Sequence, residues 1–289
     1  MTKILAIGES LFDYFPNQKI LGGAPLNFAV HGVQLGADVS LLTRVGEDDL
    51  GEEIVDTLAM RSIDIQYIQY DREKATGKVD ITFTDEQQSN PDYHIVEDVA
   101  WDYLEFYPHF SEEFSDFDCI YFGTLAQRNE ASRKTIYEIL KNFSGFKLLD
   151  LNLRKPYLDL DLILQSIQLA DGLKLNLDEA QYLQDNLNFS DNYSDWLTEY
   201  NLKWLVITKG ELGTIWIDRN GIFSGDQVAV EPQENADSVG AGDAVCAMLI
   251  TQYLGGHAPE TIVKKANEIG AYVASCAGAT PFLPLQLCF

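Results

Sequence analysis

The sequence has few of the features that mark a binding site for nucleic acid, for a membrane or for a structural metal. Its 289 residues contain 20 Lys and Arg against 45 Asp and Glu, a formal net charge of −25. This charge argues against nucleic acid or an anionic membrane as a partner, since neither would be attracted at long range. No apolar run approaches the roughly 20 residues that cross a bilayer, and the four cysteines form no CxxC pair. We therefore expect neither a zinc site nor a membrane segment.

Two further motifs are missing. The sequence contains no glycine-rich loop with a phosphate-binding lysine, and after the first expected strand it reads GESLFD rather than GxGxxG. The missing GxGxxG argues against a dinucleotide-dependent oxidoreductase. The chain also begins without a charged leader followed by an apolar stretch, so we expect no signal peptide and a cytoplasmic protein.

Short apolar strands alternate with helical segments along most of the chain. Pro25 suits the first turn of the first expected helix, and Gly36 suits its end. The expected strands and helices at the start of the chain lie at 3–8, 24–37, 38–46 and 48–62, and the alternation resumes over 118–210. This order predicts an α/β fold with a doubly wound, mostly parallel central sheet and helices on both faces. We expect a single domain over 1–289.

Two regions interrupt the alternation. Several segments have a β-rich composition with a period of two residues and predict a small β lid that stands off the main sheet. These segments lie near 10–20, 77–84 and 92–100. The stretch EQQSNP, at 86–91, has turn chemistry. At 213–225 the sequence predicts a hairpin with a type I′ turn formed by Asn220 and Gly221.

The stretch ADSVGAGDAV, residues 236–245, joins a glycine pair to the start of an apolar helix. Gly240 and Gly242 flank Ala241, and Asp243 opens the helical run. The first amides of a helix have no partner within it and lie at the positive end of its dipole. Glycine lets an anion approach such amides closely. The stretch therefore predicts an anion site beside a carboxylate base, although GxG alone also suits a tight loop packed on a strand.

DSVGAGDAV resembles the C-terminal signature of the ribokinase/PfkB carbohydrate kinase family, which usually has the form D-[ST]-x-G-A-G-D. The N-terminal signature of that family is similar to LGGAPLNFAVHGVQLGADVSLLTRVGEDDLGEEI, at 21–54. Further family-like elements are DLNLR at 150–154, NLDE at 176–179 and VITKGELGT at 206–214. The resemblance extends from Gly8 to the closing CAGATPFLP and covers nearly all of the chain.

The resemblance implies an ATP-dependent sugar kinase of the fructokinase-like type. Asp243 would take the proton from the attacking hydroxyl, and the amides of Gly240, Ala241 and Gly242 would form an anion hole for the transferring phosphoryl group. Other residues match the positions at which the family grips its acceptor sugar: Asp13, Gly22, Gly23 and Asn27. An Asp can accept hydrogen bonds from two adjacent hydroxyls, and an Asn both donates and accepts.

Asn176 and Glu179 match the family element NxxE, which orders Mg²⁺ largely through water. The same pair also predicts a capping box at a helix start, and the two roles are compatible. A further set matches the nucleotide side of the family's site: Asn152, Thr208, Lys209, Gly210, Gly213 and Asn267. Arg154 could neutralise the nucleotide or the phosphorylated product, or form a surface ion pair. Asn267 could equally be a polar residue on an amphipathic helix.

The identity of the sugar is the most open part of the prediction. GGAPLNFA is closer to the fructokinase-like signature than to that of nucleoside kinases, so we expect fructose. The stretch DEQQSNPDY, at 85–93, departs from the arginine-bearing pattern expected of a fructokinase lid, which leaves 2-keto-3-deoxygluconate, ribose and tagatose open. A non-catalytic relative that binds sugar or nucleotide is a further alternative. The resemblance also leaves open a monovalent cation site and a homodimer formed through the lid.

Overall fold

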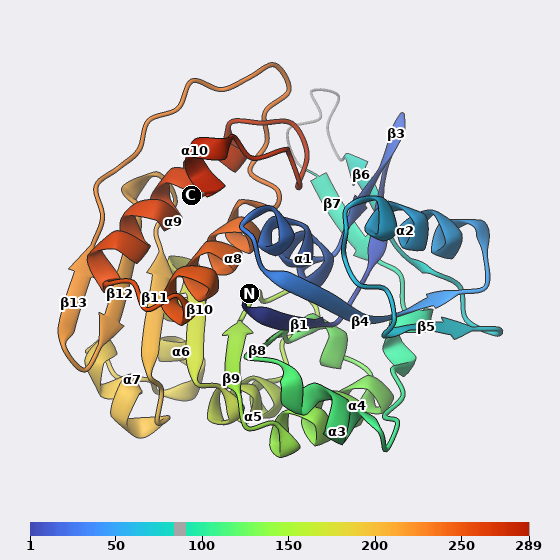
Figure 1. The fold of residues 1–289 in the computed structure, drawn as a ribbon, viewed down its shortest axis with the longest axis horizontal. Coiled ribbons are helices and arrows are strands. Elements are labelled where there is room, and N and C mark those ends of the chain that lie inside the picture. The colour runs from blue at the N-terminus through green and yellow to red at the C-terminus, as the bar shows by residue number, and fades with distance from the viewer. Residues whose placement is uncertain (84–90, 289) are drawn as a thin grey trace.

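The computed structural model describes residues 1–83 and 91–288, and its main feature is a large sheet. The strands of this sheet are β1 Lys3–Ile7, β4 Asp38–Gly46, β5 Ile68–Asp71, β8 Cys119–Gly123, β9 Phe146–Asp150, β10 Gly172–Asn176, β11 Trp204–Thr208, β12 Thr214–Asp218 and β13 Gly221–Ser224. Their order is β13-β12-β11-β10-β9-β8-β1-β4-β5 (Figure 1). Neighbours pair in parallel from β5 to β11, whereas β12 and β13 are antiparallel additions at one edge. The predicted doubly wound, mostly parallel sheet is confirmed.

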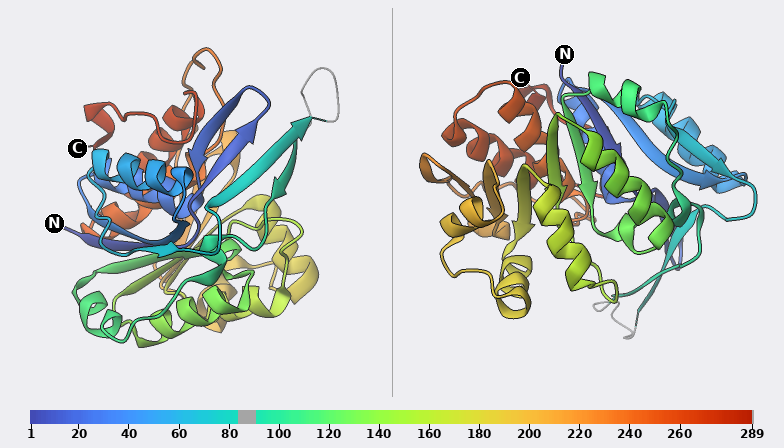
Figure 2. Two further views of the ribbon diagram at one scale, coloured as in Figure 1. Left: turned by 90° about the vertical axis from the view of Figure 1, so that its right-hand side faces the viewer. Right: turned by 90° about the horizontal axis from the view of Figure 1, so that it is seen from below.

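Helices cover both faces of this sheet (Figures 1 and 2). One face carries α1 Ala24–Gln34, α2 Asp49–Met60, α8 Ala241–Leu254 and α9 Pro259–Ala274, which supply buried residues to one hydrophobic cluster. The other carries α3 Phe110–Glu113, α4 Glu130–Asn142, α5 Leu160–Leu169, α6 Leu177–Leu187 and α7 Tyr193–Glu199, which supply a second cluster. The short helix α10, Leu285–Cys288, follows α9 near the end of the chain.

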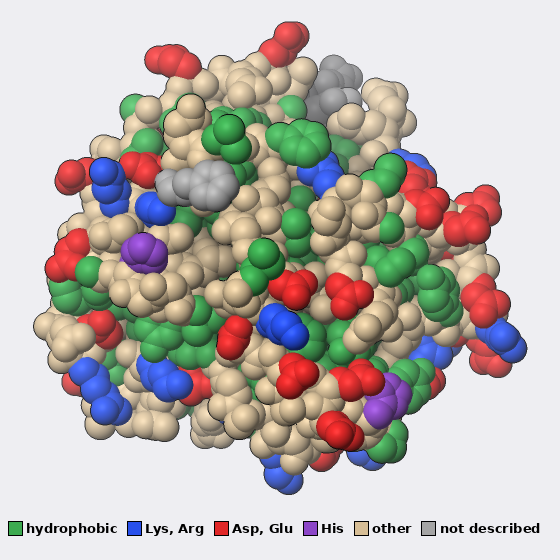
Figure 3. Space-filling view, in the orientation of Figure 1, with side chains coloured by type: hydrophobic (Ala, Val, Ile, Leu, Met, Phe, Trp, Pro, Cys, Tyr) green, Lys and Arg blue, Asp and Glu red, His purple; other side chains and the backbone are tan. Residues whose placement is uncertain are grey.

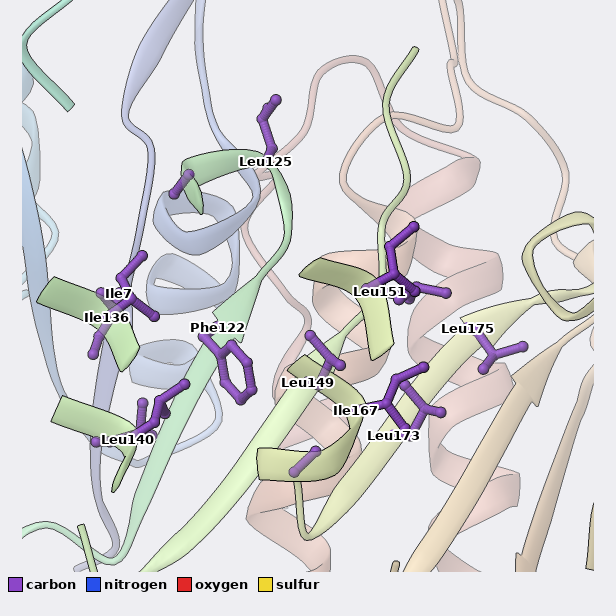
Figure 4. Packing of buried hydrophobic residues seen from close by; sticks show 14 of the residues in the cluster. Ile7, Phe122, Leu125, Ile136, Leu140, Leu149, Leu151, Ile167, Leu173 and Leu175 are labelled. Atoms are coloured by element: carbon purple, nitrogen blue, oxygen red, sulfur yellow. The ribbon is translucent and has the colours of Figure 1, made fainter. Parts of the chain in front are cut away.

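The two clusters follow from the period of two residues along each strand. In β1, Leu5 and Ile7 point to the cluster under α4 and α5, whereas Ile4 and Ala6 point to the cluster under α1 and α8. Because both faces are covered, the strand is apolar at every one of these positions rather than at alternate ones. Figure 4 shows the cluster under α4 and α5, in which Phe122 and Leu149 lie between the sheet and the helices.

A second, smaller sheet stands off the main one (Figure 2, left). Its strands are β2 Leu11–Phe15, β3 Gln18–Gly22, β6 Gly77–Phe83 and β7 Pro91–Ile95, in the order β3-β2-β6-β7. The segments expected to form a lid therefore lie in or next to this sheet, apart from residue 84, which falls outside the described residues. The stretch EQQSNP also lies outside them, except for its last residue. Lys19, at the tip of the β2–β3 hairpin, forms an ion pair with Glu53 of α2.

One local prediction is wrong. The hairpin β12–β13 exists, but Asp218 pairs with Gly221, so Arg219 and Asn220 are the central residues of its turn. Neither has a positive φ, which a type I′ turn requires at both central positions. Instead, the Asp218 carboxylate accepts a hydrogen bond of 2.7 Å from the Asn220 amide. This side-chain bond gives the turn an alternative to the glycine-dependent geometry.

The structure also bears on three features of the composition, namely the apolar segments, the cysteines and the excess of acidic residues. Within the described residues, no helix is long and apolar enough to cross a membrane. All four cysteines are free, and three of them are buried. Acidic side chains are distributed over the face drawn in Figure 3, with Lys and Arg between them, rather than gathered in one patch.

Candidate active site

The candidate site is centred on the N-terminus of α8. Gly240 occupies the N-cap position with φ 78°, and no side chain caps the helix. The amides of Gly240, Gly242 and Asp243 have no hydrogen-bond acceptor among residues 1–83 and 91–288. The Ala241 amide donates to the Ser238 carbonyl, but at a long 3.3 Å. The start of α8 thus presents free donors at the positive end of a 14-residue helix.

Gly240 is needed for two separate reasons. Its positive φ favours glycine. In addition, a Cβ atom there would lie 2.1 Å from the Ala279 carbonyl oxygen and 2.7 Å from the Ala279 Cα. Gly242 is less constrained, because its Cβ would meet only the Lys174 Nζ, at 3.1 Å. The first glycine therefore fixes the geometry of the helix start against the C-terminal segment.

Asp243 lies just behind these amides and is only 8% exposed. The Asn27 Nδ2 of α1 donates a 2.9 Å hydrogen bond to Asp243 Oδ2. Burial raises the pKa of Asp243 to about 7, and the charge of Asp150 raises it further, whereas Asn27, Lys174 and Arg154 oppose the shift. A carboxylate of this kind is poised to accept a proton near neutral pH.

A buried ion pair lies beneath the helix start. Lys174 Nζ, in β10, is 3.1 Å from Asp150 Oδ1 at the end of β9, and both side chains are almost fully buried. Burial by itself lowers the pKa of Lys174, but Asp150, Cys246 and Glu179 together outweigh this effect and raise the pKa above its usual value. Asp150 also accepts hydrogen bonds from Tyr121 and Cys246. Lys174 thus remains a cation directly under Gly242.

The residues expected to grip a sugar lie where the small sheet meets α1. The Asp13 side chain in β2 lies over Gly22 of β3, where a Cβ would be 2.7 Å from Asp13 Oδ2. Gly23, the N-cap of α1, has φ 107°, and a Cβ there would be 2.5 Å from the Glu9 carbonyl oxygen. Burial raises the pKa of Asp13 to about 6. Asn27 follows on the first turns of α1, so these four residues lie along one continuous stretch of structure.

Arg154 connects this region with Asp243. Its positive charge lowers the pKa of three carboxyl groups, those of Glu9, Asp13 and Asp243, which places the guanidinium within electrostatic range of all three. The side chain is itself exposed. The groups on which the charge of Arg154 acts are carboxylates of the candidate site, and its role towards the nucleotide or the phosphorylated product stays a prediction.

Asn176 and Glu179 form a complete capping box at the start of α6. The Glu179 amide donates to Asn176 Oδ1 at 2.9 Å, and the Asn176 amide donates to Glu179 Oε2 at 2.8 Å. The other carboxylate oxygen, Oε1, accepts from the Leu153 amide at 2.8 Å. Each oxygen of the buried Glu179 therefore already accepts one backbone hydrogen bond. The described residues include no group of three or more His, Cys, Asp or Glu side chains placed to hold a metal.

The residues expected on the nucleotide side fall into two groups. Lys209, Gly210 and Gly213 form a tight loop after β11, in which the Lys209 amide donates to the Gly213 carbonyl at 2.8 Å. Asn267 of α9 lies against this loop, since a Cβ on Gly213 would be 2.9 Å from Asn267 Nδ2. The second group lies at the ends of the two strands on either side of β10: Thr208 at the end of β11 and Asn152, with φ 42°, after β9.

Comparison with known proteins identifies the family. The sequence profile of the pfkB family of carbohydrate kinases matches residues 1–286. The chain belongs to the PfkB family. It is 25% identical over 303 residues to a fructokinase from Klebsiella pneumoniae, covering 98% of this chain and 97% of that protein.

Solved structures of PfkB kinases share the fold. An uncharacterized sugar kinase from Pyrococcus horikoshii in complex with ATP superposes with a TM-score of 0.81 at 26% identity, covering 96% of this chain and 94% of that one. A fructokinase from Xylella fastidiosa with bound ATP has a TM-score of 0.87 at 22% identity, covering 99% and 97%. This PfkB chain therefore has the ribokinase-like α/β fold expected from its two signatures.

Sequence reasoning missed two charged residues of this PfkB kinase. Lys174 lies in the apolar strand GLKLN, and a lysine within a buried strand is a signal that it has a buried partner. Glu9 directly follows Gly8 at the end of β1 and is 3% exposed, and burial raises its pKa to about 7. Asp150 is the first residue of the family-like element DLNLR, but the motif gives no sign that it is the partner of Lys174.

Proposed function

We propose that this protein transfers the γ-phosphoryl group of ATP to a hydroxyl of a small carbohydrate, and that the carbohydrate is fructose. The observation that carries the proposal is the uncapped helix start at Gly240, with the buried carboxylate of Asp243 directly behind it. Phosphoryl transfer needs donors positioned in advance for the developing charge, and a base for the attacking hydroxyl. The N-terminus of α8 supplies both within four residues.

Asp243 is the proposed base. It takes the proton from the sugar hydroxyl while the sugar oxygen bonds to the γ-phosphorus and the bond from that phosphorus to the ADP oxygen breaks. A pKa of about 7 suits this role. A carboxylate with such a pKa binds a proton more tightly than an exposed one, and a large fraction of it is still ionised at neutral pH.

The proposed anion hole consists of backbone amides and one buried cation. The free amides of Gly240 and Gly242, and the weakly engaged amide of Ala241, are the donors. Lys174 lies under Gly242 and adds a full positive charge. A positioned donor of this kind contributes about 3 to 4 kcal/mol to a transition state in which negative charge develops. These groups take the place of the missing phosphate-binding lysine loop.

Asn176 and Glu179 would hold Mg²⁺ through water. Their hard oxygen atoms suit this ion, and each Glu179 oxygen can accept a further hydrogen bond beside the backbone amide that it already binds. Direct coordination is less suited, because the capping box holds both side chains against the backbone. When bound, Mg²⁺ would offset the negative charge of the nucleotide phosphates.

The remaining contacts divide between the two substrates. Asp13, Gly22, Gly23 and Asn27 would bind the sugar below the small sheet, which we propose as a lid that excludes water from the site. The nucleotide would lie along a second set of residues: Asn152, Thr208, Lys209, Gly210, Gly213 and Asn267. We also propose that the protein forms a homodimer through the small sheet, whose outer strands β3 and β7 each have an edge unpaired by any described residue.

A coupled assay of ADP release over a panel of sugars tests the proposal. The panel contains ketoses, aldoses, keto-deoxy acids and nucleosides, each with ATP and Mg²⁺. We expect the highest kcat/KM with fructose. The proposed kinase activity is contradicted if the wild-type protein binds a sugar but releases no ADP with any member of the panel. A non-catalytic relative would behave in this way.

A sugar acid such as 2-keto-3-deoxygluconate is a second candidate acceptor. The observation in its favour is Arg154, an exposed cation within electrostatic range of Asp13 on the sugar side. An acceptor carboxylate could pair with this guanidinium. If the sugar acid is the true acceptor, Arg154→Lys should raise the KM of the keto-deoxy acid at least about tenfold. It should leave the KM of neutral sugars nearly unchanged.

A further inference from the structure

Helix α1 carries two buried polar side chains near the start of α8, and only the first has a role in the proposed function. The two helices lie side by side (Figure 1). The first is Asn27, which donates to the Asp243 carboxylate. His31 lies one turn later on the same face of α1, four residues further along the helix. It is 0% exposed and is the only His among the buried polar residues of the described chain.

His31 binds the C-terminal segment rather than α8 itself. Its Nε2 lies 2.9 Å from the carbonyl oxygen of Ala279, which is 248 residues away in the sequence. A carbonyl oxygen only accepts, so Nε2 must carry the proton and donate it. Nδ1 is then left bare, and it has no hydrogen-bond partner in the described residues. Burial lowers the pKa of His31 to about 4, so the ring remains neutral around pH 7.

Ala279 lies between His31 and the first glycine of the proposed anion hole. The backbone of Ala279 packs so closely on Gly240 that a single Cβ atom would not fit between them. Ala279 is itself only 3% exposed, so it has little room to move away. A shift of the Ala279 carbonyl would therefore displace Gly240 and the amides that follow it.

The residues that follow Ala279 in the C-terminal segment are also bound by side chains of α1 and of the residue after α2. Gln34, three residues after His31, donates to the Pro281 carbonyl at 3.2 Å and accepts from the Leu283 amide at 2.8 Å. Arg61, which directly follows α2, lies over the ring of Phe282. These contacts stabilise the segment but lie further along it than the point where Ala279 meets Gly240.

We infer that His31 is a positioning residue for phosphoryl transfer, which holds Gly240 and the free amides of α8 in place through the Ala279 carbonyl. The inference rests on the proposed function for its catalytic readout. Through Asn27 and His31, one face of α1 would then align both the base and the anion hole. The chemistry of His31 is that of a neutral hydrogen-bond donor, and it takes no part in proton transfer.

The test compares variants that keep or remove this donor. His31→Gln places an amide nitrogen near the position of Nε2 and keeps the donor, whereas His31→Leu fills a similar space without it. We expect His31→Leu to lower kcat by about 10-fold to 100-fold, since small misplacements of catalytic groups have effects of this size. The KM values for sugar and ATP should change less than threefold, and His31→Gln should recover most of the lost kcat.

Gln34→Ala is the matched control, because it removes contacts to the same segment without touching Ala279. It should lower the midpoint of thermal unfolding about as much as His31→Leu but change kcat less than threefold. The inference is overturned if the two variants lose kcat equally. It is also overturned if His31→Leu keeps wild-type kcat, or if His31→Gln is as slow as His31→Leu.

Hydrogen exchange gives a readout that does not depend on activity. Exchange of the amides in 236–245 should be faster in His31→Leu than in the wild type, and unchanged in Gln34→Ala. If the wild-type protein releases no ADP with any sugar, the proposed function fails, yet this comparison still tests whether His31 positions Gly240. Equal exchange in both variants would overturn the inference. If His31→Leu does not fold, the same comparison is made with His31→Ala.

Discussion

Two helices begin near the candidate site, and they differ in whether their first backbone amides are hydrogen-bonded. In α6, the side chains of Asn176 and Glu179 bond to the backbone and satisfy two amides. In α8, Gly240 has no side chain to offer, and three amides have no partner among the described residues. Both starts lie within elements that resemble family motifs. The difference shows that a motif at a helix start can have two outcomes. Its side chains can bond to the amides of its own helix, or those amides can stay available for a ligand.

The comparison predicts that α8 carries the chemistry, so the largest effect should come from Asp243. Asp243→Asn removes the proposed base but keeps a side chain of the same shape. We expect kcat to fall by about 10³-fold to 10⁴-fold, at the upper end of general base contributions. Binding of ATP, measured by calorimetry, should remain within threefold of the wild type. A loss of less than tenfold in kcat would contradict the assignment of the base.

Stability gives the control for the same variant. Because burial raises the pKa of Asp243 from 3.8 to about 7, the folded state binds this proton more tightly than the unfolded state. The ionised carboxylate therefore destabilises the folded protein progressively as the pH rises from about 4, and fully above about 7. Asp243→Asn removes this effect. We expect its unfolding midpoint to exceed that of the wild type at pH 8, and the difference to become small at pH 4.

The second prediction concerns the two glycines of α8. Gly240→Ala introduces a Cβ that collides with the Ala279 backbone, so the helix start must move. We expect kcat to fall by about 10²-fold to 10³-fold, as when an anion-hole donor is lost. Gly242→Ala places a Cβ 3.1 Å from Lys174 Nζ but meets no backbone atom elsewhere in the described chain, and we expect a loss of about tenfold or less.

Gly256→Ala is the control for backbone strain. Gly256 follows the other end of α8 with φ 74°, and a Cβ atom there would have no neighbour within 4 Å, so alanine adds strain without a collision. This variant should lower stability by about 1 kcal/mol and leave kcat unchanged. If Gly240→Ala behaves in the same way, the amides of α8 do not contribute to catalysis.

The third prediction uses pH to test Asp243 as the base. Since the base must be ionised, kcat/KM should fall about tenfold for each pH unit below about 7 and level off above it. Asn27→Ala removes a donor that favours the ionised carboxylate. The acid limb of the profile should therefore move to higher pH in this variant. Asp243 is not the base if kcat/KM of the wild type begins to fall only near pH 4. The same conclusion follows if the acid limb of the profile has the same position in Asn27→Ala as in the wild type.

The smallest effect is expected at the start of α6. Asn176→Ala removes the cap and should lower stability by about 1 kcal/mol. The control is Asn192→Ala, which removes the cap of α7, where the Asn192 side chain accepts from the Ser194 amide. Both variants should lower the unfolding midpoint similarly. Only Asn176→Ala should raise the Mg²⁺ concentration needed for half-maximal rate. If the two variants need the same Mg²⁺ concentration, Asn176 caps α6 but does not help to hold the ion.

Much of the fold could be predicted from local patterns. The alternation of apolar strands with helices indicated the parallel sheet, because strands buried on both faces are apolar throughout. The turn after β12 could not be predicted from Asn220 and Gly221, since the Asp218 side chain offers the backbone another hydrogen bond. Strand β5 and helix α7 were also missed, as short elements carry little periodic signal.

The candidate site could be predicted only in part. Motif matching predicts Asp243 and its glycines, and Gly22, Gly23 and Asn27, because each of these lies within a contiguous signature. Lys174 and Glu9 were missed, since their burial and their neighbours come from strands and loops that are distant in the sequence. For His31 the sequence favours a packing or surface role, and nothing in its own helix reveals the carbonyl that it binds.

The sequence by itself determined the strand and helix order, the family, and the positions of the glycines and carboxylates, because these follow from local periodicity and contiguous motifs. The tertiary structure decided which of these groups are free to act. It buries Asp243 beside Asn27 and Asp150, places Lys174 beneath the helix start, and packs Ala279 against Gly240. Those relations depend on burial and on contacts between distant segments, which only the folded chain brings together.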